Sequence, residues 1–186
     1  LKTVYVPKGT YKAYSDAYRE NLPETVRIKE TGGDDFIVVD GEVTGYTGDG
    51  TEVTIPEGIT KIGTSAFKKS QIQKITIPAE VTEIGENAFQ GSTALQEVVF
   101  SGENNVTEIG SYAFSGCGEL TGFSFGENLT EIKEHTFESC TKLSGELRLP
   151  KNLTVIGAYA FSSCSALNGN LNIPENVTRI GEGAFS

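Results

Sequence analysis

A pair of residues, Ala-Phe or Thr-Phe, recurs six times along this chain with the same neighbours around it. Successive phenylalanines are 22, 25, 23, 24 and 24 residues apart. A period of this length, without a long helical pattern inside it, is typical of a solenoid in which each repeat forms one short coil. One coil cannot bury its own apolar face, so we expect the recurring residues to be structural and function to lie where the repeats vary. The pairs are Ala66-Phe67, Ala88-Phe89, Ala113-Phe114, Thr136-Phe137, Ala160-Phe161 and Ala184-Phe185.

Each repeat predicts a short strand, a turn and a short helix. The strand is indicated by alternation, as in Val98 and Phe100 on either side of Val99. Stacked coils would pair these strands in parallel into one sheet, with turns and short helices on the other side of the solenoid. The Ile-Gly pair that follows, as in Ile109-Gly110, predicts a core residue and a close-packed backbone, although Lys133 replaces the glycine once. The equivalent inward pairs are Val53/Ile55, Ile75/Ile77, Phe123/Phe125, Leu147/Leu149 and Leu171/Ile173.

Charge and hydropathy exclude some partners. The chain has 186 residues, a formal net charge of −10 and a pI of about 4.6, without a Lys/Arg cluster. Such a chain repels phosphate backbones and anionic membrane surfaces, so we expect neither nucleic acid nor a membrane as a partner. No apolar stretch approaches the roughly 18 residues that span a bilayer. The sequence has no Met and both ends fall inside repeats, so we expect a fragment that is truncated at its C-terminus.

Three cysteines each lie three residues after a repeat phenylalanine: Cys117, Cys140 and Cys164. Ser70 and Ser92 hold the same place in earlier repeats, which predicts a buried column of small side chains. Neighbouring coils lie about 4.8 Å apart, so a disulfide between adjacent cysteines is an open alternative. The cysteines lack the paired spacing of zinc ligands, and the aspartates fit no calcium-binding loop, so we predict no metal and no cofactor.

The complete pattern is strand, Pro, turn, then Val-Thr-x-Ile-Gly-x-x-Ala-Phe-x-x-Cys-x-x-Leu. This pattern resembles the leucine-rich repeats of BspA-like bacterial surface proteins, the Treponema pallidum type of leucine-rich repeat, over residues 51–186. The resemblance implies a leucine-rich-repeat solenoid with a parallel sheet on one face. It also implies a cell-surface or secreted protein, since some members are adhesins that bind host matrix proteins or other cells. No catalytic residue accompanies the repeat in that family, so the resemblance implies a chain that is not an enzyme.

The first fifty residues depart from the repeat. Residues 1–30 are predicted to end a preceding array, because Val4, Val6 and Pro7 match a strand half and the tyrosines in residues 10–21 have helical spacing. In the resembled family such a helix often closes an array. Residues 25–29 can form a further strand. Residues 31–50 are predicted to cap the next array with a hairpin over residues 36–46, which turns at Asp40-Gly41. Residues 51–186 would form the solenoid.

Equivalent positions of stacked coils form columns, and two columns are candidate binding sites. The position two before each phenylalanine brings together Tyr112, His135 and Tyr159, whose rings could hold a sugar face or a peptide or could simply stack and shield the core. The outward strand column is preferred by analogy with other solenoids, whose concave sheets bind partners. Its candidate residues are Thr76, Val99, Ser124, Arg148 and Asn172.

Two other patterns have a structural explanation. The column Lys61, Glu83, Glu108, Glu131, Val155 and Arg179 stacks three glutamates, and either a solvated face or a cationic partner would accommodate them. Four Asn-x-Thr sequons, at Asn105, Asn128, Asn152 and Asn176, arise from the repeat's turn asparagine and threonine. Neither pattern requires a modification or a metal.

These observations favour a non-enzymatic recognition or adhesion module that presents a repeat scaffold to a protein or glycan, including host matrix. Its expected localisation is the cell surface or the extracellular space. The alternative is a passive spacer that holds another domain away from the cell surface. Deleting whole coils discriminates the two, because a spacer tolerates the deletion as long as its reach is kept.

Overall fold

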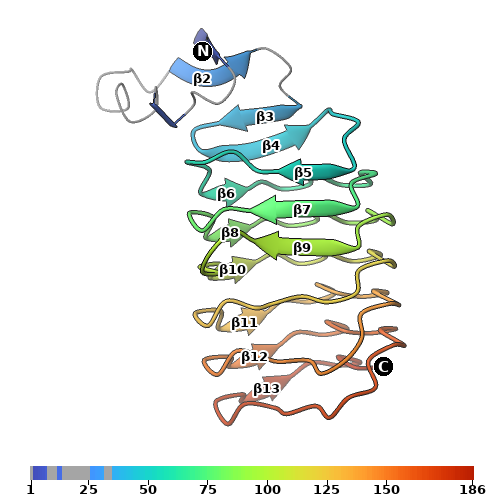
Figure 1. The fold of residues 1–186 in the computed structure, drawn as a ribbon. Helices are drawn as coiled ribbons and strands as arrows, with labels where there is room; N and C mark the ends of the chain where they lie inside the picture. The colour runs from blue at the N-terminus through green and yellow to red at the C-terminus, as the bar shows by residue number, and fades with distance from the viewer. Residues whose placement is uncertain (1, 8–11, 14–25, 32–34) are drawn as a thin grey trace.

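A computed structural model describes residues 2–7, 12–13, 26–31 and 35–186 of the chain, and it is a β-solenoid (Figure 1). The chain winds in flat coils that stack on one another, and each coil adds short parallel strands. The predicted stacking of parallel strands is therefore confirmed. The strands are β1 (Lys2–Pro7), β2 (Val26–Thr31), β3 (Phe36–Val39), β4 (Glu42–Tyr46), β5 (Glu52–Thr54), β6 (Lys61–Ile62), β7 (Lys74–Ile77), β8 (Glu83–Ile84), β9 (Glu97–Phe100), β10 (Glu108–Ile109), β11 (Glu131–Ile132), β12 (Val155–Ile156) and β13 (Arg179–Ile180).

The predicted hairpin is present at the N-terminal end of the stack. Strands β3 and β4 pair antiparallel around Asp40 and Gly41, whose positive φ angles of 51° and 79° suit a two-residue turn. Strand β4 then pairs in parallel with β6, so the hairpin occupies an edge that would otherwise be open. Strands β1 and β2 form a separate parallel pair. The helix predicted for residues 10–21 lies outside the described residues apart from Lys12 and Ala13, and the division into three segments stays a prediction.

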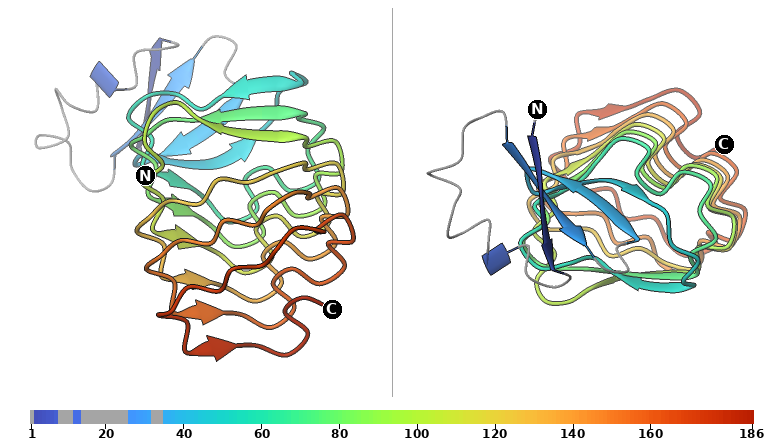
Figure 2. Two further views of the ribbon diagram at one scale, coloured as in Figure 1. Left: turned by 60° about the horizontal axis from the view of Figure 1, so that its bottom comes forward. Right: turned by 90° about the horizontal axis from the view of Figure 1, so that it is seen from above.

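The strands lie in more than one ladder, which corrects the prediction of one sheet. Strands β5, β7 and β9 form a three-stranded ladder, which we call the strand face. On a different face of the coil, which we call the Ile-Gly face, β10, β8, β6, β4 and β3 form one sheet, and β11, β12 and β13 form another (Figures 1 and 2). A coil therefore pairs with its neighbours through two short segments, because the Ile-Gly segment is extended as well as the predicted strand.

Aromatic side chains form the centre of the core. The six repeat phenylalanines stack with ring centroids 5.0–5.4 Å apart and ring planes within 5° of parallel. Five of the six are essentially inaccessible, while Phe185 in the last coil is 38% exposed. The alanine before the ring leaves room for the neighbouring coil. In one repeat the buried Thr136 stands in place of this alanine, and its hydroxyl donates to Lys133 O at 2.8 Å. The prediction of an inward phenylalanine column is confirmed.

The short helix predicted around each Ala-Phe pair is wrong; a series of turns takes its place. The residue two before each phenylalanine and the residue two after each of the first five have positive φ, as at Ser65 (59°) and Lys69 (56°), which a right-handed helix cannot contain. Alternate amides donate within the turn and across to the next coil. Ser70 N donates to Phe67 O at 3.1 Å, whereas Phe67 N donates to Ala88 O at 2.8 Å. The turns thus form hydrogen bonds between coils, whereas a helix would use the same amides for bonds within one coil.

The cysteines form the predicted buried column. Cys117, Cys140 and Cys164 are free thiols, so the alternative of a disulfide is not realised. Each Sγ lies 3.1–3.2 Å from the carbonyl oxygen of a phenylalanine in the preceding coil, and Ser92 Oγ donates likewise to Phe67 O at 2.7 Å. Burial raises the pKa of Cys117 to about 12 and that of Cys140 well above its ordinary value. These thiols are therefore protonated packing residues and not nucleophiles.

Candidate functional site

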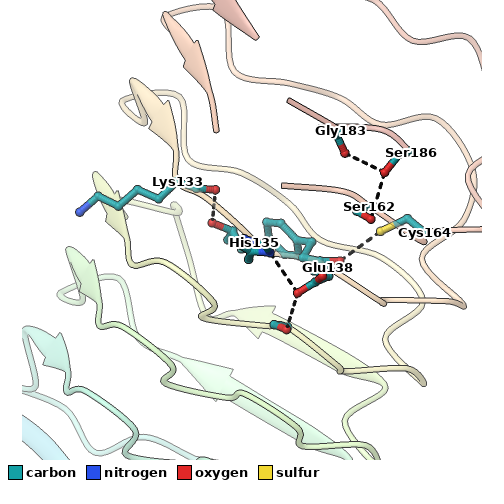
Figure 3. A network of polar contacts seen from close by, with 10 residues as sticks. Lys133, His135, Glu138, Ser162, Cys164, Gly183 and Ser186 are labelled. Carbon is teal, nitrogen blue, oxygen red and sulfur yellow. Dashed lines mark hydrogen bonds and ion pairs between the residues drawn. The ribbon is translucent and has the colours of Figure 1, made fainter. Parts of the chain in front are cut away.

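The three predicted ring residues do form a ladder, at the turns on one edge of the stack. The ring centroids of Tyr112 and His135 are 4.5 Å apart and those of His135 and Tyr159 are 5.1 Å apart, with ring planes 6° and 17° from parallel. His135 Nδ1 lies 3.1 Å from Glu138 Oε2 (Figure 3), and Tyr159 donates its hydroxyl to Glu182 at 3.1 Å. The hydrogen bond with Glu182 raises the pKa of Tyr159.

Stacking decides what this ladder can offer a partner. Each ring covers the face of its neighbour, and a Cβ added at Gly183, the next position of the column, would lie 2.5 Å from Tyr159 Cε1. The faces that these rings turn toward one another are therefore occupied, so the column offers a partner mainly ring edges. The residues also have positive φ angles of 55–58°, which Ser65 and Asn87 share in the earlier coils. The column is thus built on a strained turn that asparagine or glycine would satisfy better.

The outward strand column is only partly ordered by hydrogen bonds. Thr54, Thr76 and Val99 are aligned by the registers of β5, β7 and β9. Ser124, Arg148 and Asn172 follow in later coils, where the structure has no strand. The expected strands at Phe123/Phe125, Leu147/Leu149 and Leu171/Ile173 are therefore wrong. The structure brings together the first part of the column and leaves the second part on irregular backbone.

A seam crosses the Ile-Gly face between β10 and β11. On this face the glycine N of one coil donates to the isoleucine O of the preceding coil. The N···O distances are 2.8 Å from Gly110 to Ile84, 2.7 Å from Gly157 to Ile132 and 2.8 Å from Gly181 to Ile156. Within the described part of the chain, Lys133 in the same column makes no such bond, and β10 and β11 do not pair. A Cβ at Gly157 would lie 2.5 Å from Glu134 N, which shows why a side chain is not accommodated between closely stacked coils. Lysine at position 133 therefore keeps the two ladders apart.

Lys133 also forms an ion pair within the column of stacked glutamates. Its Nζ binds Glu108, and Lys61 Nζ binds Glu83 at 2.8 Å, a hydrogen bond that raises the pKa of Lys61. Strand register places Glu83 beside Glu108. Two lysines of the chain itself thus offset the adjacent carboxylates, and the cationic partner considered from the sequence is not needed for them. The Lys133 side chain extends outward from the turn that carries His135 (Figure 3).

On the strand face, β9 is the last strand of its ladder. Ser101 N and Glu97 N donate to the coil of β7, at 3.0 and 3.1 Å, so odd-numbered residues of β9 face β7. The N–H and C=O groups of Val98 and Phe100 point the other way. Among the described residues none of these groups has a backbone partner, and only Gln96 O accepts a bond from the next coil, from Thr121 N at 3.2 Å. Strand β9 therefore ends its ladder as an edge.

Aromatic rings pack across this edge. Phe123 and Phe125 occupy the two inward strand positions, where the preceding coil has Val98 and Phe100 and the other coils have Val, Ile or Leu. The Phe123 ring packs edge-on against Phe100, with centroids 5.9 Å apart and planes at 90°, and at 60° to Phe125 with centroids 5.0 Å apart. The coils remain joined at the turns, where Phe114 N donates to Thr136 O at 2.8 Å.

A groove lies on the strand face at this level, with a volume of about 520 Å³. We call it the seam groove. Its apolar lining includes the buried Val98 and the half-buried Phe123, Phe125 and Leu149. Of the predicted strand-column residues, Ser124 and Arg148 line it, whereas Thr76, Val99 and Asn172 do not. Sequence reasoning missed the groove, although the paired phenylalanines and Lys133 were its visible signs. Its charged lining residues are Glu97, Glu127, Glu146 and Arg148.

The sequon asparagines act between coils. The side-chain amides of Asn105, Asn152 and Asn176 donate to backbone carbonyls of the preceding coil at 2.9–3.1 Å. Their repeat position is therefore explained by stacking. In the described ranges, no three His, Cys, Asp or Glu residues are grouped so as to hold a metal ion. The same part of the chain contains no helix of the length and apolarity that crossing a bilayer requires.

Comparison with protein families finds one model that covers most of the chain. The BspA type leucine rich repeat region matches residues 48–144 and 145–186, in six copies. A search of curated proteins found no match.

Solved structures of bacterial leucine-rich repeat proteins share the fold. A leucine rich cell surface protein from Faecalibacterium prausnitzii is 31% identical with a TM-score of 0.72, over 84% of this chain and 51% of that one. The T. pallidum leucine-rich repeat protein is 26% identical with a TM-score of 0.68, over 82% and 86%. A leucine-rich repeat protein from Eubacterium ventriosum is 26% identical with a TM-score of 0.65, over 100% and 58%. This chain thus spans about half the length of the first of these proteins.

Proposed function

Because the chain belongs to the BspA-type leucine-rich repeat family, we propose that it is a recognition module of a bacterial cell-surface or secreted protein. It presents a repeat scaffold to a protein or glycan partner and catalyses no reaction. The name of the F. prausnitzii relative, a cell surface protein, supports this localisation. The cysteine thiols are buried with raised pKa, and His135 contacts a carboxylate and two rings without a nucleophile, so the described residues provide no catalytic group.

The observation that carries the proposal is the contrast between the interior and the strand face. The spine repeats one ring at spacings of 5.0–5.4 Å, while the outward column changes from Thr76 and Val99 to Ser124, Arg148 and Asn172. A rigid scaffold with variable residues at fixed spacing suits recognition of an extended partner. A spacer needs the scaffold and has no use for a groove at one level.

The test is capture of partners by the immobilised chain, from a panel of purified matrix proteins and from a glycan array. Two variants locate the contact. Arg148→Ser changes the strand face, where the side chain is 85% exposed. Tyr112→Asn with Tyr159→Asn removes the ladder edges and uses the residue that Asn87 places in the same turn, so the fold is preserved.

We expect at least one ligand to bind the unaltered chain, and Arg148→Ser to weaken its binding at least tenfold. The result that contradicts the proposal is an absence of binding in both panels, together with full activity of the parent protein after whole coils are deleted with reach preserved. That combination would establish the spacer instead.

A further inference from the structure

We propose that Asn168 is a site of spontaneous covalent modification, at which the chain's own backbone converts the asparagine into aspartate and isoaspartate. This inference goes beyond the proposed function, because it concerns the chemistry of the scaffold and needs no partner. An asparagine reacts in this way when the backbone nitrogen of the next residue reaches its side-chain amide carbon. The sequence and the structure together leave this approach open at Asn168.

Asn168 is the single asparagine of the chain that is followed by glycine. A Cβ on the following residue shields its backbone nitrogen from the amide carbon, and Gly169 has no Cβ. Asn170 and Asn172 lie in the same exposed stretch, but each is followed by a larger apolar residue. One short stretch thus contains one unshielded asparagine and two shielded ones, which differ in the residue that follows them.

The attacking nitrogen is not held by a hydrogen bond. In the described part of the chain, no backbone N–H between Leu167 and Val177 donates a backbone hydrogen bond, and Gly169 N lies in this stretch. By contrast, Leu153 N, which follows Asn152, donates to Pro150 O at 3.1 Å. A backbone N–H that is exposed to water and makes no bond is free to lose its proton and to move toward the side chain before it.

The side-chain amide of Asn168 is equally free. Thr121 and Ser144 hold the same position in the two preceding coils, and their hydroxyls donate to a carbonyl of the coil before them, at 3.2 and 3.4 Å. Among the described residues, the exposed Asn168 side chain makes no such bond, whereas Asn152 donates its amide to a backbone carbonyl at 2.9 Å. The Asn168 amide can therefore rotate and present its Cγ to Gly169 N.

The reaction is a ring closure followed by hydrolysis. Gly169 N gives its proton to solvent base and attacks Asn168 Cγ, the Cγ–Nδ2 bond breaks, and the leaving nitrogen takes up a proton and departs as ammonia. Water then opens the cyclic imide, whose nitrogen regains a proton. Attack of water at Cγ gives aspartate, and attack at the backbone carbonyl carbon gives isoaspartate, in which the main chain runs through the side chain. Either product adds one negative charge to a chain of net charge −10.

The test is incubation of the folded chain at 37 °C, followed by tryptic digestion and tandem mass spectrometry against an unincubated sample. Cleavage after Lys151 and Arg179 places Asn168 in one peptide with four other asparagines, which serve as internal controls. Replacement of NH by O changes the mass, and electron-transfer fragmentation distinguishes isoaspartate from aspartate. We expect both products at Asn168, formed at least tenfold faster than at any of the other four. We also expect faster formation at pH 9 than at pH 7, because the attacking nitrogen must lose its proton.

Two controls separate the contribution of the sequence from that of the structure. A synthetic peptide of residues 165–172 reports the reaction without the fold, and we expect the folded chain to react less than tenfold more slowly than this peptide. Asn168→Ser introduces the residue that Ser144 provides in the same column, and it should abolish the products at this position. The unaltered chain and the peptide test the proposal even if Asn168→Ser does not fold.

Three outcomes would overturn this inference. The first is a reaction at Asn168 that is less than tenfold faster than at the other four asparagines. The second is aspartate without isoaspartate, which would identify direct hydrolysis of the side chain. The third is a folded chain that reacts tenfold or more slowly than the peptide, which would show that the fold shields Gly169 N. None of these outcomes depends on capture of a partner, so the proposed function is tested separately.

Discussion

Replacing Gly157, a glycine of the Ile-Gly face, by alanine tests how closely the coils stack. In Gly157→Ala the added Cβ would lie 2.5 Å from Glu134 N and 2.6 Å from Lys133 C, both of them backbone atoms of the neighbouring coil. Backbone cannot move aside as a flexible side chain can, so the two coils must separate locally. The bonds at risk are Gly157 N to Ile132 O at 2.7 Å and Thr154 N to Thr130 O at 2.8 Å.

The magnitude follows from these bonds. Each backbone hydrogen bond contributes about 1 kcal/mol net, and leaving its buried groups unsatisfied costs about as much again. We therefore expect Gly157→Ala to lower the free energy of unfolding by about 2–4 kcal/mol. The assay is urea denaturation followed by circular dichroism, because the chain has no Trp for fluorescence.

Two alanine variants serve as matched controls. A Cβ at Gly122 meets nothing within 4 Å, so Gly122→Ala should be neutral or stabilising by about 0.5 kcal/mol, through the unfolded chain. Lys133→Ala lies in the same column as Gly157 but at the open seam, and the loss of its surface ion pair costs about 1 kcal/mol or less. A Gly157→Ala variant as stable as the Gly122→Ala variant would refute the close stacking of the coils.

Three further predictions concern the spine and two titrating groups. Phe137→Ala should lower the free energy of unfolding by about 3–5 kcal/mol in urea denaturation, because the ring is fully buried; a loss below about 1 kcal/mol would contradict the continuous spine. Glu182→Gln should lower the pKa of Tyr159 toward its ordinary value in an ultraviolet titration, since the bond to Glu182 raises it, and an unchanged pKa would contradict this contact. Burial raises the pKa of Cys117 to about 12, above the value of about 8.5 in the unfolded chain, so its contribution to stability is complete below about pH 8.5 and is lost as the pH rises toward 12. Cys117→Ser, which introduces the residue that Ser92 provides in the same column, should reduce this alkaline loss in urea denaturation at pH 8 and pH 10, whereas an equal loss in both proteins would exclude the thiol as its cause.

The repeat pattern predicted the interior of the molecule well. Residues that recur at one spacing must occupy equivalent environments in a stack, which predicted the phenylalanine and cysteine columns. The hairpin was predicted separately, from its Asp40-Gly41 turn. The short helix was wrong because small residues around Ala-Phe suit either a helix start or a turn. Local propensity could not distinguish these, and only the bonds between coils, such as Phe67 N to Ala88 O, select the turn.

The seam could not be predicted, although its residues were visible. Lys133 stood out as a departure from the repeat, whereas Phe123 and Phe125 fitted the inward strand pattern, and each is tolerable in a single coil. Their effect comes from the distance to the next coil, which the sequence does not contain. The two departures lie on different faces of the same coil: Lys133 lies at the break between β10 and β11, and Phe123 and Phe125 follow β9, the last strand of its ladder. Positions that break a repeat thus indicated the candidate site better than the aromatic column did.

In the described residues the ladder of the Ile-Gly face is interrupted at one level, between β10 and β11, and the ladder of the strand face ends at β9. Amide hydrogen exchange measured by NMR tests this directly, by comparing equivalent positions in different coils. We predict slow exchange at Gly110, Gly157 and Gly181 and exchange at least tenfold faster at Lys133. We also predict faster exchange at Phe100 than at Val99, which faces β7. Equal protection of all four positions of the Ile-Gly column would contradict the seam.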